Sequence, residues 1–255
     1  MTILKTRALT RRFGGVTAVD DLTVDIGDEG ITAFIGPNGA GKTTLFNLLC
    51  GVDRPTSGTI RFADMDVTGW SASKIAKLGM ARTFQNLELF DAMSVREHAL
   101  VGATRHGHSG VLSSAMRLPR HYAAERAVHR QAEAAMDQMG LSDFAPARAG
   151  DLPYGLQRRV ELARALAAQP RLLLLDEPMA GLNDAESHEV GDLVRGIAAT
   201  GTAILLVEHH IETVMRLSDT VFVLNFGQLL ARGTPAEVQA DPSVVEAYLG
   251  TEEQQ

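Results

Sequence analysis

The sequence of 255 residues has little cysteine, few aromatic residues and no long apolar run. Its single cysteine, Cys50, excludes an intrachain disulfide and a cysteine-rich metal site. No apolar run approaches the roughly 20 residues that a helix needs to cross a bilayer. The longest runs, 172–175 and 203–207, have the length of buried strands. Because the first residues also lack the apolar core of a signal peptide, we expect a cytoplasmic protein that meets a membrane only by docking onto another chain.

Positive charge is in the minority. Lys and Arg number 24 against 31 Asp and Glu, which gives a formal net charge of −7. A broad basic surface for nucleic acid is therefore not expected. Histidines do gather in one region, and two of them stand in a Gly/Ser loop with no cysteine or carboxylate at ligand spacing. A solvated loop is therefore favoured over a metal site. The histidines of this region are His98, His106, His108, His121 and His129.

The order of apolar patterns predicts an α/β core. Short β-like runs fill residues 3–35, and 59–67 reads as a further strand. The buried runs at 172–175 and 203–207 are each followed by a helical pattern, and such alternation is typical of a parallel sheet. A β pair is predicted at 220–233 and a last helix at 242–250.

Residues 86–150 differ in composition from the rest of the chain. Ala, Arg, His and Met are frequent, β-branched runs are few, and 94–103 and 122–140 read as helices. The pattern predicts a helical lobe inserted into the core. The predicted organisation is a nucleotide-binding core with an antiparallel β subdomain (1–85 and 151–235), the lobe (86–150), and a C-terminal helix and tail (236–255).

The stretch "GPNGAGKT", residues 36–43, carries the strongest local signal. It matches G-x-x-x-x-G-K-[ST] and lies between a strand and an apolar-striped helix. Glycines let successive backbone N–H groups surround phosphate oxygens, and the helix N-terminus favours negative charge. Lys42 is expected to reach the β- and γ-phosphates and the Thr43 hydroxyl to bind Mg²⁺. The pattern predicts a nucleoside triphosphate site.

The stretch "LLLLDEP", residues 172–178, supplies the complementary acids. A buried strand ends at Asp176, which is expected to hold Mg²⁺ through water. Glu177 follows directly, where a carboxylate can orient and polarise an attacking water molecule.

Taken together, these motifs resemble the ATP-binding subunits of ABC transporters over nearly the whole chain. The resemblance implies a RecA-like core, ATP and Mg²⁺ as ligands, and hydrolysis coupled to transport. It makes Gln85 a contact of Mg²⁺ and water, and His209 a contact of the γ-phosphate. It identifies 178–184 as the D-loop, with Asn183 where many relatives have Asp. The nucleotide contacts that it implies are Phe13, which stacks on adenine, and Gly36, Pro37, Asn38, Gly39, Ala40, Gly41, Lys42, Thr43 and Thr44.

The family signature, Leu-Ser-Gly-Gly-Gln, is altered here. Its five positions are occupied by Leu152, Pro153, Tyr154, Gly155 and Leu156. In the family, this segment contacts the γ-phosphate of ATP held by a second ATPase chain. Pro153 removes a hydroxyl and a backbone N–H, whereas the glycine and the helix N-terminus remain. We expect this segment to make a weakened but usable contact with the γ-phosphate. The alternative is that it now serves only as the start of a helix.

Within the family, the insertion after Gln85, the "PMAGLN" segment and the tail resemble the ATPases of branched-chain amino-acid importers. This implies transmembrane permease subunits, a second ATPase subunit and, indirectly, a periplasmic or extracellular solute-binding protein as partners. A heterodimer is favoured and a homodimer is kept open. The alternatives are ATPases of urea or lipopolysaccharide transporters, a non-transport ABC ATPase, a P-loop kinase and a regulatory subunit without hydrolysis. The intact Glu177 and His209 argue against the last.

Overall fold

The computed structural model describes residues 1–83, 87–104 and 119–252, without the side chains of 119–121 and 249–252. The chain forms two compact units. The first comprises Met1–Arg82, Arg171–Glu177 and Ile197–Gln255, and the second comprises Thr83–Pro170 and Pro178–Gly196. Among the described residues, no helix has the length and apolar character of a membrane span.

The first unit contains a six-stranded, mainly parallel sheet in the order β10-β9-β3-β8-β7-β6. Three strands are buried at every residue, which explains why they read as continuous apolar runs. Only β10 runs antiparallel to its neighbour. The strand bounds are β3 Ile31–Ile35, β6 Met80–Arg82, β7 Leu172–Asp176, β8 Ala203–Val207, β9 Thr220–Asn225 and β10 Gln228–Gly233.

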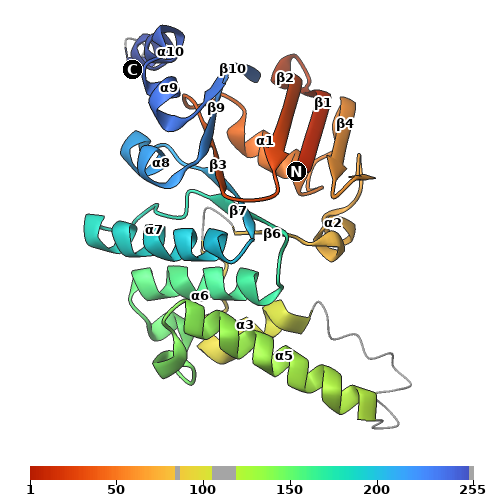
Figure 1. Cartoon of the computed structure of the whole chain (residues 1–255), viewed down its shortest axis with the longest axis vertical. Helices are drawn as coiled ribbons and strands as arrows, with labels where there is room; N and C mark the ends of the chain where they lie inside the picture. The colour runs from red at the N-terminus through yellow and green to blue at the C-terminus, as the bar shows by residue number, and fades with distance from the viewer. Residues whose placement is uncertain (84–86, 105–118, 253–255) are drawn as a thin grey trace. The chain divides into compact units, whose positions relative to one another are not determined.

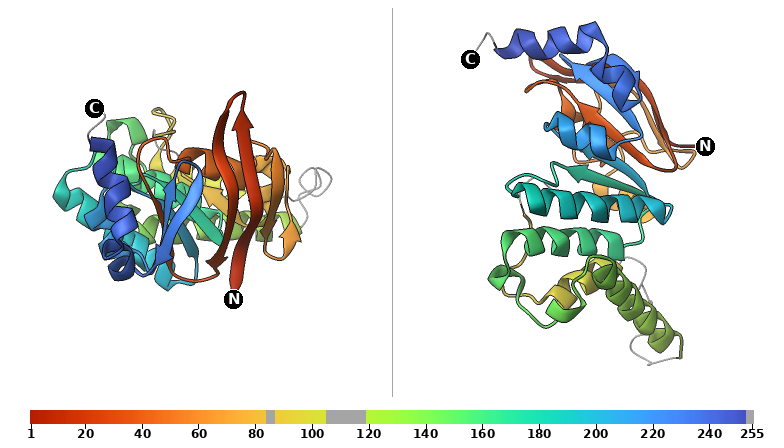
Figure 2. Two further views of the ribbon diagram at one scale, coloured as in Figure 1. Left: turned by 90° about the horizontal axis from the view of Figure 1, so that it is seen from above. Right: turned by 60° about the vertical axis from the view of Figure 1, so that its left-hand side comes forward.

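The same unit contains an antiparallel sheet in the order β2-β1-β4-β5, with β1 and β2 as long neighbouring strands (Figure 2, left, red). The expectation of one strand over 59–67 is wrong. Ala63 and Asp64 have φ of 50° and 62°, so they form a tight turn that splits the run into a hairpin. The bounds are β1 Thr2–Phe13, β2 Val16–Gly27, β4 Ser57–Phe62 and β5 Met65–Asp66.

One apolar cluster joins both sheets of the first unit to its helix α1 (Lys42–Leu49). Phe34 of β3 stacks on Phe222 of β9 with ring centroids 5.1 Å apart. Phe46 of α1 is fully buried in this cluster. The core therefore fixes the helix that begins directly after the glycine loop. Four more helices complete the unit: α2 Ala72–Leu78, α8 Ile211–Leu217, α9 Pro235–Gln239 and α10 Pro242–Glu252.

The second unit is helical, as predicted, and is drawn in yellow-green to cyan in Figure 1. It is larger than the predicted lobe 86–150, because α6 and most of α7 cluster with it. Helix α3 packs on both α5 and α6. A fully buried ion pair, Arg158 Nη1 to Glu161 Oε2 at 2.7 Å, lies within α6. The helix bounds are α3 Val95–Ala103, α5 Pro119–Gln138, α6 Tyr154–Ala167 and α7 Asp184–Ala199.

The predicted fold class is thus confirmed in its parts: a mainly parallel core sheet, an antiparallel β sheet and a helical unit.

Candidate functional site

The loop between β3 and α1 requires glycine at two positions. Gly36 has φ 150°, and a Cβ atom there would lie 2.1 Å from the carbonyl oxygen of Leu224. Gly41 has φ 97° and caps α1, and its Cβ would lie 2.2 Å from the carbonyl oxygen of Ala18. Within the part of the chain that the structure describes, no side chain caps the start of this helix. The first N–H groups of α1 therefore remain for an anion at the loop.

Lys42 places a cation in this loop. Its Nζ donates to the carbonyl oxygens of Gly36, at 2.5 Å, and Pro37, at 3.0 Å. Burial lowers the pKa of Lys42, and the negative charges of Glu177 and Asp176 oppose that change. The ammonium group is thus partly desolvated and held within range of both acids. Such a group gains strongly from a phosphate partner.

Asp176, Glu177 and His209 come from the ends of two neighbouring parallel strands, β7 and β8. Asp176 is buried as the last residue of β7. Glu177 has φ 47°, an uncommon conformation for a residue other than glycine, and its N–H donates to the Val207 carbonyl at 2.9 Å. His209 Nδ1 lies 3.7 Å from Glu177 Oε2. The two predicted catalytic side chains are therefore neighbours in the structure.

One residue of this cluster, Arg82, was not predicted from the sequence. Its Nη2 donates to Asp176 Oδ2 and its Nη1 to Asn47 Oδ1, each at 2.7 Å. An arginine after a short apolar run and just before Gln85 was the available signal. Gln85 itself lies outside the described residues.

Phe13, the predicted adenine contact, ends β1 and is 44% exposed. The Arg11 guanidinium carbon lies 4.3 Å from the centre of its ring. An aromatic ring that keeps a face near solvent is suited to stacking on a base.

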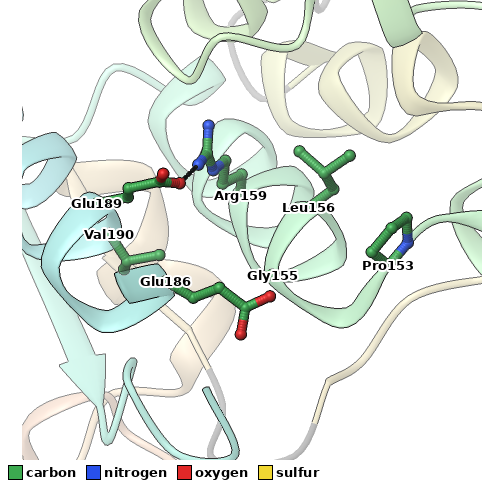
Figure 3. A pocket seen from close by; sticks show the side chains of 7 residues that line it. All are labelled: Pro153, Gly155, Leu156, Arg159, Glu186, Glu189 and Val190. Atoms are coloured by element: carbon green, nitrogen blue, oxygen red, sulfur yellow. Dashed lines mark hydrogen bonds and ion pairs between the residues drawn. The ribbon is translucent and has the colours of Figure 1, made fainter. Parts of the chain in front are cut away.

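The altered signature segment lies in the second unit, at the start of α6. Pro153 is the N-cap, with φ −53°, ψ 149° and no side-chain cap, and its carbonyl accepts from the N–H groups of Leu156 and Gln157. Gly155 is buried, and a Cβ there would lie 2.9 Å from Glu186 Oε1. Figure 3 shows the small pocket beside it, about 180 Å³, which is lined by Pro153, Gly155, Leu156, Arg159, Glu186, Glu189 and Val190.

The D-loop contacts the signature segment inside this unit. Gly181 has φ 77°, and its Cβ would lie 3.2 Å from the ring of Tyr154. Asn183 caps α7, because its Oδ1 accepts from the N–H of Glu186 at 3.0 Å, and Glu186 Oε2 accepts in return from the N–H of Asn183 at 3.1 Å. Asn183 thus forms a reciprocal cap that an amide satisfies as well as a carboxylate.

Comparison with known proteins decides the family. The ABC transporter family matches residues 19–180, which is more than half of the chain. The chain belongs to the ABC transporter family. A second family, described as branched-chain amino acid ATP-binding cassette transporter, matches residues 228–254 of this ABC protein.

Individual ABC relatives match nearly end to end. The branched-chain amino acid transport ATP-binding protein BraF of Pseudomonas aeruginosa is 41% identical over 249 residues, covering 97% of this chain and 98% of its own. LivG of Escherichia coli is 40% identical with the same coverage. A crystal structure of the ADP conformation of an ABC transporter cassette has a TM-score of 0.85 at 31% identity, with 98% of this chain and 99% of that chain covered.

The segment that matches the branched-chain family reaches the ABC phosphate loop. Burial raises the pKa of Tyr248 in α10 to about 12, and a hydrogen bond with the backbone of Gly36 opposes that rise. In addition, the N–H of Gly227 donates to the Ala40 carbonyl at 3.1 Å. The C-terminal part of the chain therefore lies against the loop at Gly36 and Ala40, which sequence patterns did not suggest.

The first unit thus brings together the predicted residues of the phosphate loop, Asp176, Glu177 and His209. The second holds the signature segment, Leu152–Leu156. Phe13 stands at the end of β1, and Thr43 and Thr44 are the second and third residues of α1.

Proposed function

We propose that this ABC protein binds and hydrolyses ATP to drive import of branched-chain amino acids. One observation carries the ATPase part: Glu177 Oε2 and His209 Nδ1 lie 3.7 Å apart just beyond the ends of adjacent strands, and Lys42, which follows the glycine loop, interacts with the charge of Glu177. The solute class rests on the relatives, named as branched-chain amino acid transport proteins and similar over nearly the whole chain.

The loop amides and Lys42 would bind the phosphates, with Phe13 against adenine. Glu177 would orient the attacking water and take on its proton, while His209 contacts the γ-phosphate. A hydroxyl and a carboxylate, from Thr43 and Asp176, are the oxygen donors that Mg²⁺ prefers. When bound there, with Gln85 as a further ligand, the ion would neutralise charge on the β- and γ-phosphates.

The signature segment would serve a second chain. In a head-to-tail pair, Pro153–Gly155 and the N-terminus of α6 would face ATP held by the partner subunit. We propose a heterodimer with a different ATPase subunit, because this chain has all the catalytic residues of its own site but an altered signature for the other. The pair would sit peripherally on permease subunits, at the cytoplasmic face of the membrane.

The test of ATP hydrolysis is a comparison of wild type with Glu177→Gln and Lys42→Ala. Wild type should hydrolyse ATP only with Mg²⁺. Glu177→Gln should keep ATP binding and lose hydrolysis, whereas Lys42→Ala should lose binding. Hydrolysis that survives in Glu177→Gln would refute the role of Glu177.

The test of the solute uses the transporter in proteoliposomes with its solute-binding protein. Leucine, isoleucine or valine should stimulate ATP hydrolysis. Stimulation by urea instead, or activity that follows lipopolysaccharide, would replace the amino-acid assignment but leave the ATPase assignment intact.

A further inference from the structure

Arg82 occupies a junction of the ATP site. It is the last residue of β6, an edge strand that pairs in parallel with β7. Its neighbour across the pair is Leu174, two residues before Asp176. Arg82 thus lies on the strand beside the one that ends at Asp176.

The guanidinium group of Arg82 joins two parts of the site. Nη2 donates to Asp176 Oδ2, and Nη1 donates to Asn47 Oδ1 on α1, each at 2.7 Å. The Phe46 ring centre lies 5.7 Å from the guanidinium carbon. Only 9% of the Arg82 side chain and 5% of the Asp176 side chain are exposed. One planar group therefore links the helix of the phosphate loop to the buried acid.

We propose that Arg82 is a positioning residue for the metal site, which acts by holding the Asp176 carboxylate in place relative to α1. This inference rests on the proposed role of Asp176 as a metal ligand. A planar guanidinium fixes the direction of each N–H bond, unlike an ammonium group. The bond from Arg82 to Oδ2 therefore holds the carboxylate in one orientation.

The charges around Asp176 indicate that Arg82 holds this carboxylate in place and does not compete with the metal for it. Glu177 and Asp176 carry two negative charges, and Lys42 and Arg82 carry two positive ones. Without Arg82, the buried carboxylate would lose its partner, and an uncompensated buried charge is costly. The carboxylate would then be free to turn away from this orientation, and that change would weaken metal binding.

The experiment measures Mn²⁺ binding to the purified full-length chain with saturating ADP, by electron paramagnetic resonance. Arg82→Met removes the charge and keeps the length, Arg82→Lys keeps the charge, and Arg7→Met is the control. Arg7 pairs with Asp25 on the exposed side of the antiparallel sheet. Arg82→Met should raise the Mn²⁺ dissociation constant about ten-fold or more, as loss of a hydrogen bond to a charged group does. Arg82→Lys should recover part of this loss, and Arg7→Met should match wild type.

Two further readouts separate positioning from general support of the fold. ADP affinity without metal should stay within about two-fold of wild type in Arg82→Lys. If Arg82→Met does not fold, Asn47→Ala replaces it; this variant keeps the ion pair, loses the link to α1, and should weaken Mn²⁺ binding by a smaller factor.

Three results would overturn the inference. These are unchanged Mn²⁺ affinity in the folded variants, tighter Mn²⁺ binding, and an equal loss of ADP binding without metal. Mn²⁺ binding by the wild-type chain distinguishes a failure of this inference from a failure of the proposed function. If wild-type chain binds ADP but no Mn²⁺, the role of Asp176 itself fails.

Discussion

Substitution Pro153→Ser tests how far the altered signature limits the transporter. Pro153 is exposed and has φ −53° and ψ 149° as the N-cap of α6. An N-cap serine adopts the same extended backbone, so the change needs no rearrangement. It returns the hydroxyl and the backbone N–H that proline lacks.

The substitution should change the free energy of unfolding much less than it changes the strength of the contact with ATP. A serine cap stabilises a helix by about 1 kcal/mol. Loss of proline costs about 0.4–1 kcal/mol through the unfolded state, so the free energy of unfolding should hardly change. A new hydrogen bond from the hydroxyl to a phosphate contributes about 1.5–3 kcal/mol. That corresponds to at least ten-fold tighter closure on the ATP held by the partner subunit.

The assay is ATP hydrolysis by the assembled transporter, with Pro153→Ala as the matched control. Alanine removes the ring, as serine does, but supplies neither cap nor hydroxyl. Pro153→Ser should hydrolyse ATP faster than both wild type and Pro153→Ala. Equal rates for the serine and alanine variants would refute the reasoning, because the hydroxyl would then contribute nothing.

Three other outcomes follow from buried groups. Glu161→Leu leaves the charge of Arg158 buried without its partner acid, so it should lower the free energy of unfolding by about 3–5 kcal/mol in urea unfolding. Adding Arg158→Met should restore most of this stability. A double variant that is as unstable as Glu161→Leu would contradict this. Burial raises the pKa of Cys50 to about 11, so the thiol stays protonated below that pH. It should react with Ellman's reagent at pH about 8 only after unfolding, and rapid labelling of native protein would disprove this. Gly36→Ala should abolish ATP binding in a fluorescent-nucleotide titration, because its Cβ meets the Leu224 carbonyl; wild-type affinity would show that the loop adapts.

The sequence predicted those features whose cause is local. The phosphate loop depends on glycines beside one strand and one helix, so "GPNGAGKT" could be interpreted without tertiary contacts. Asp176 and Glu177 follow a continuous apolar run, which marks a central strand and its end. The positions of these side chains follow directly from such runs.

Other features depend on contacts between distant residues. Arg82 and Asp176 are 94 residues apart, and β6 has only three residues, too few for any periodicity. The turn at Ala63–Asp64 uses two non-glycine residues at positive φ, which composition does not signal. Packing of α6 with α3 and α5, rather than its own pattern, assigns it to the helical unit.

The position of β3 also matters during synthesis on the ribosome. Both its neighbours in the sheet, β8 and β9, lie far later in the chain than β3 itself. The N–H of Ile31 donates to Asp219, 188 residues later, at 2.7 Å. A nascent chain that ends before β9 would leave this strand without a partner on one side. The loop that follows β3 would therefore be supported on both sides only once β9 has been synthesised, and we expect nucleotide binding to begin only at that stage.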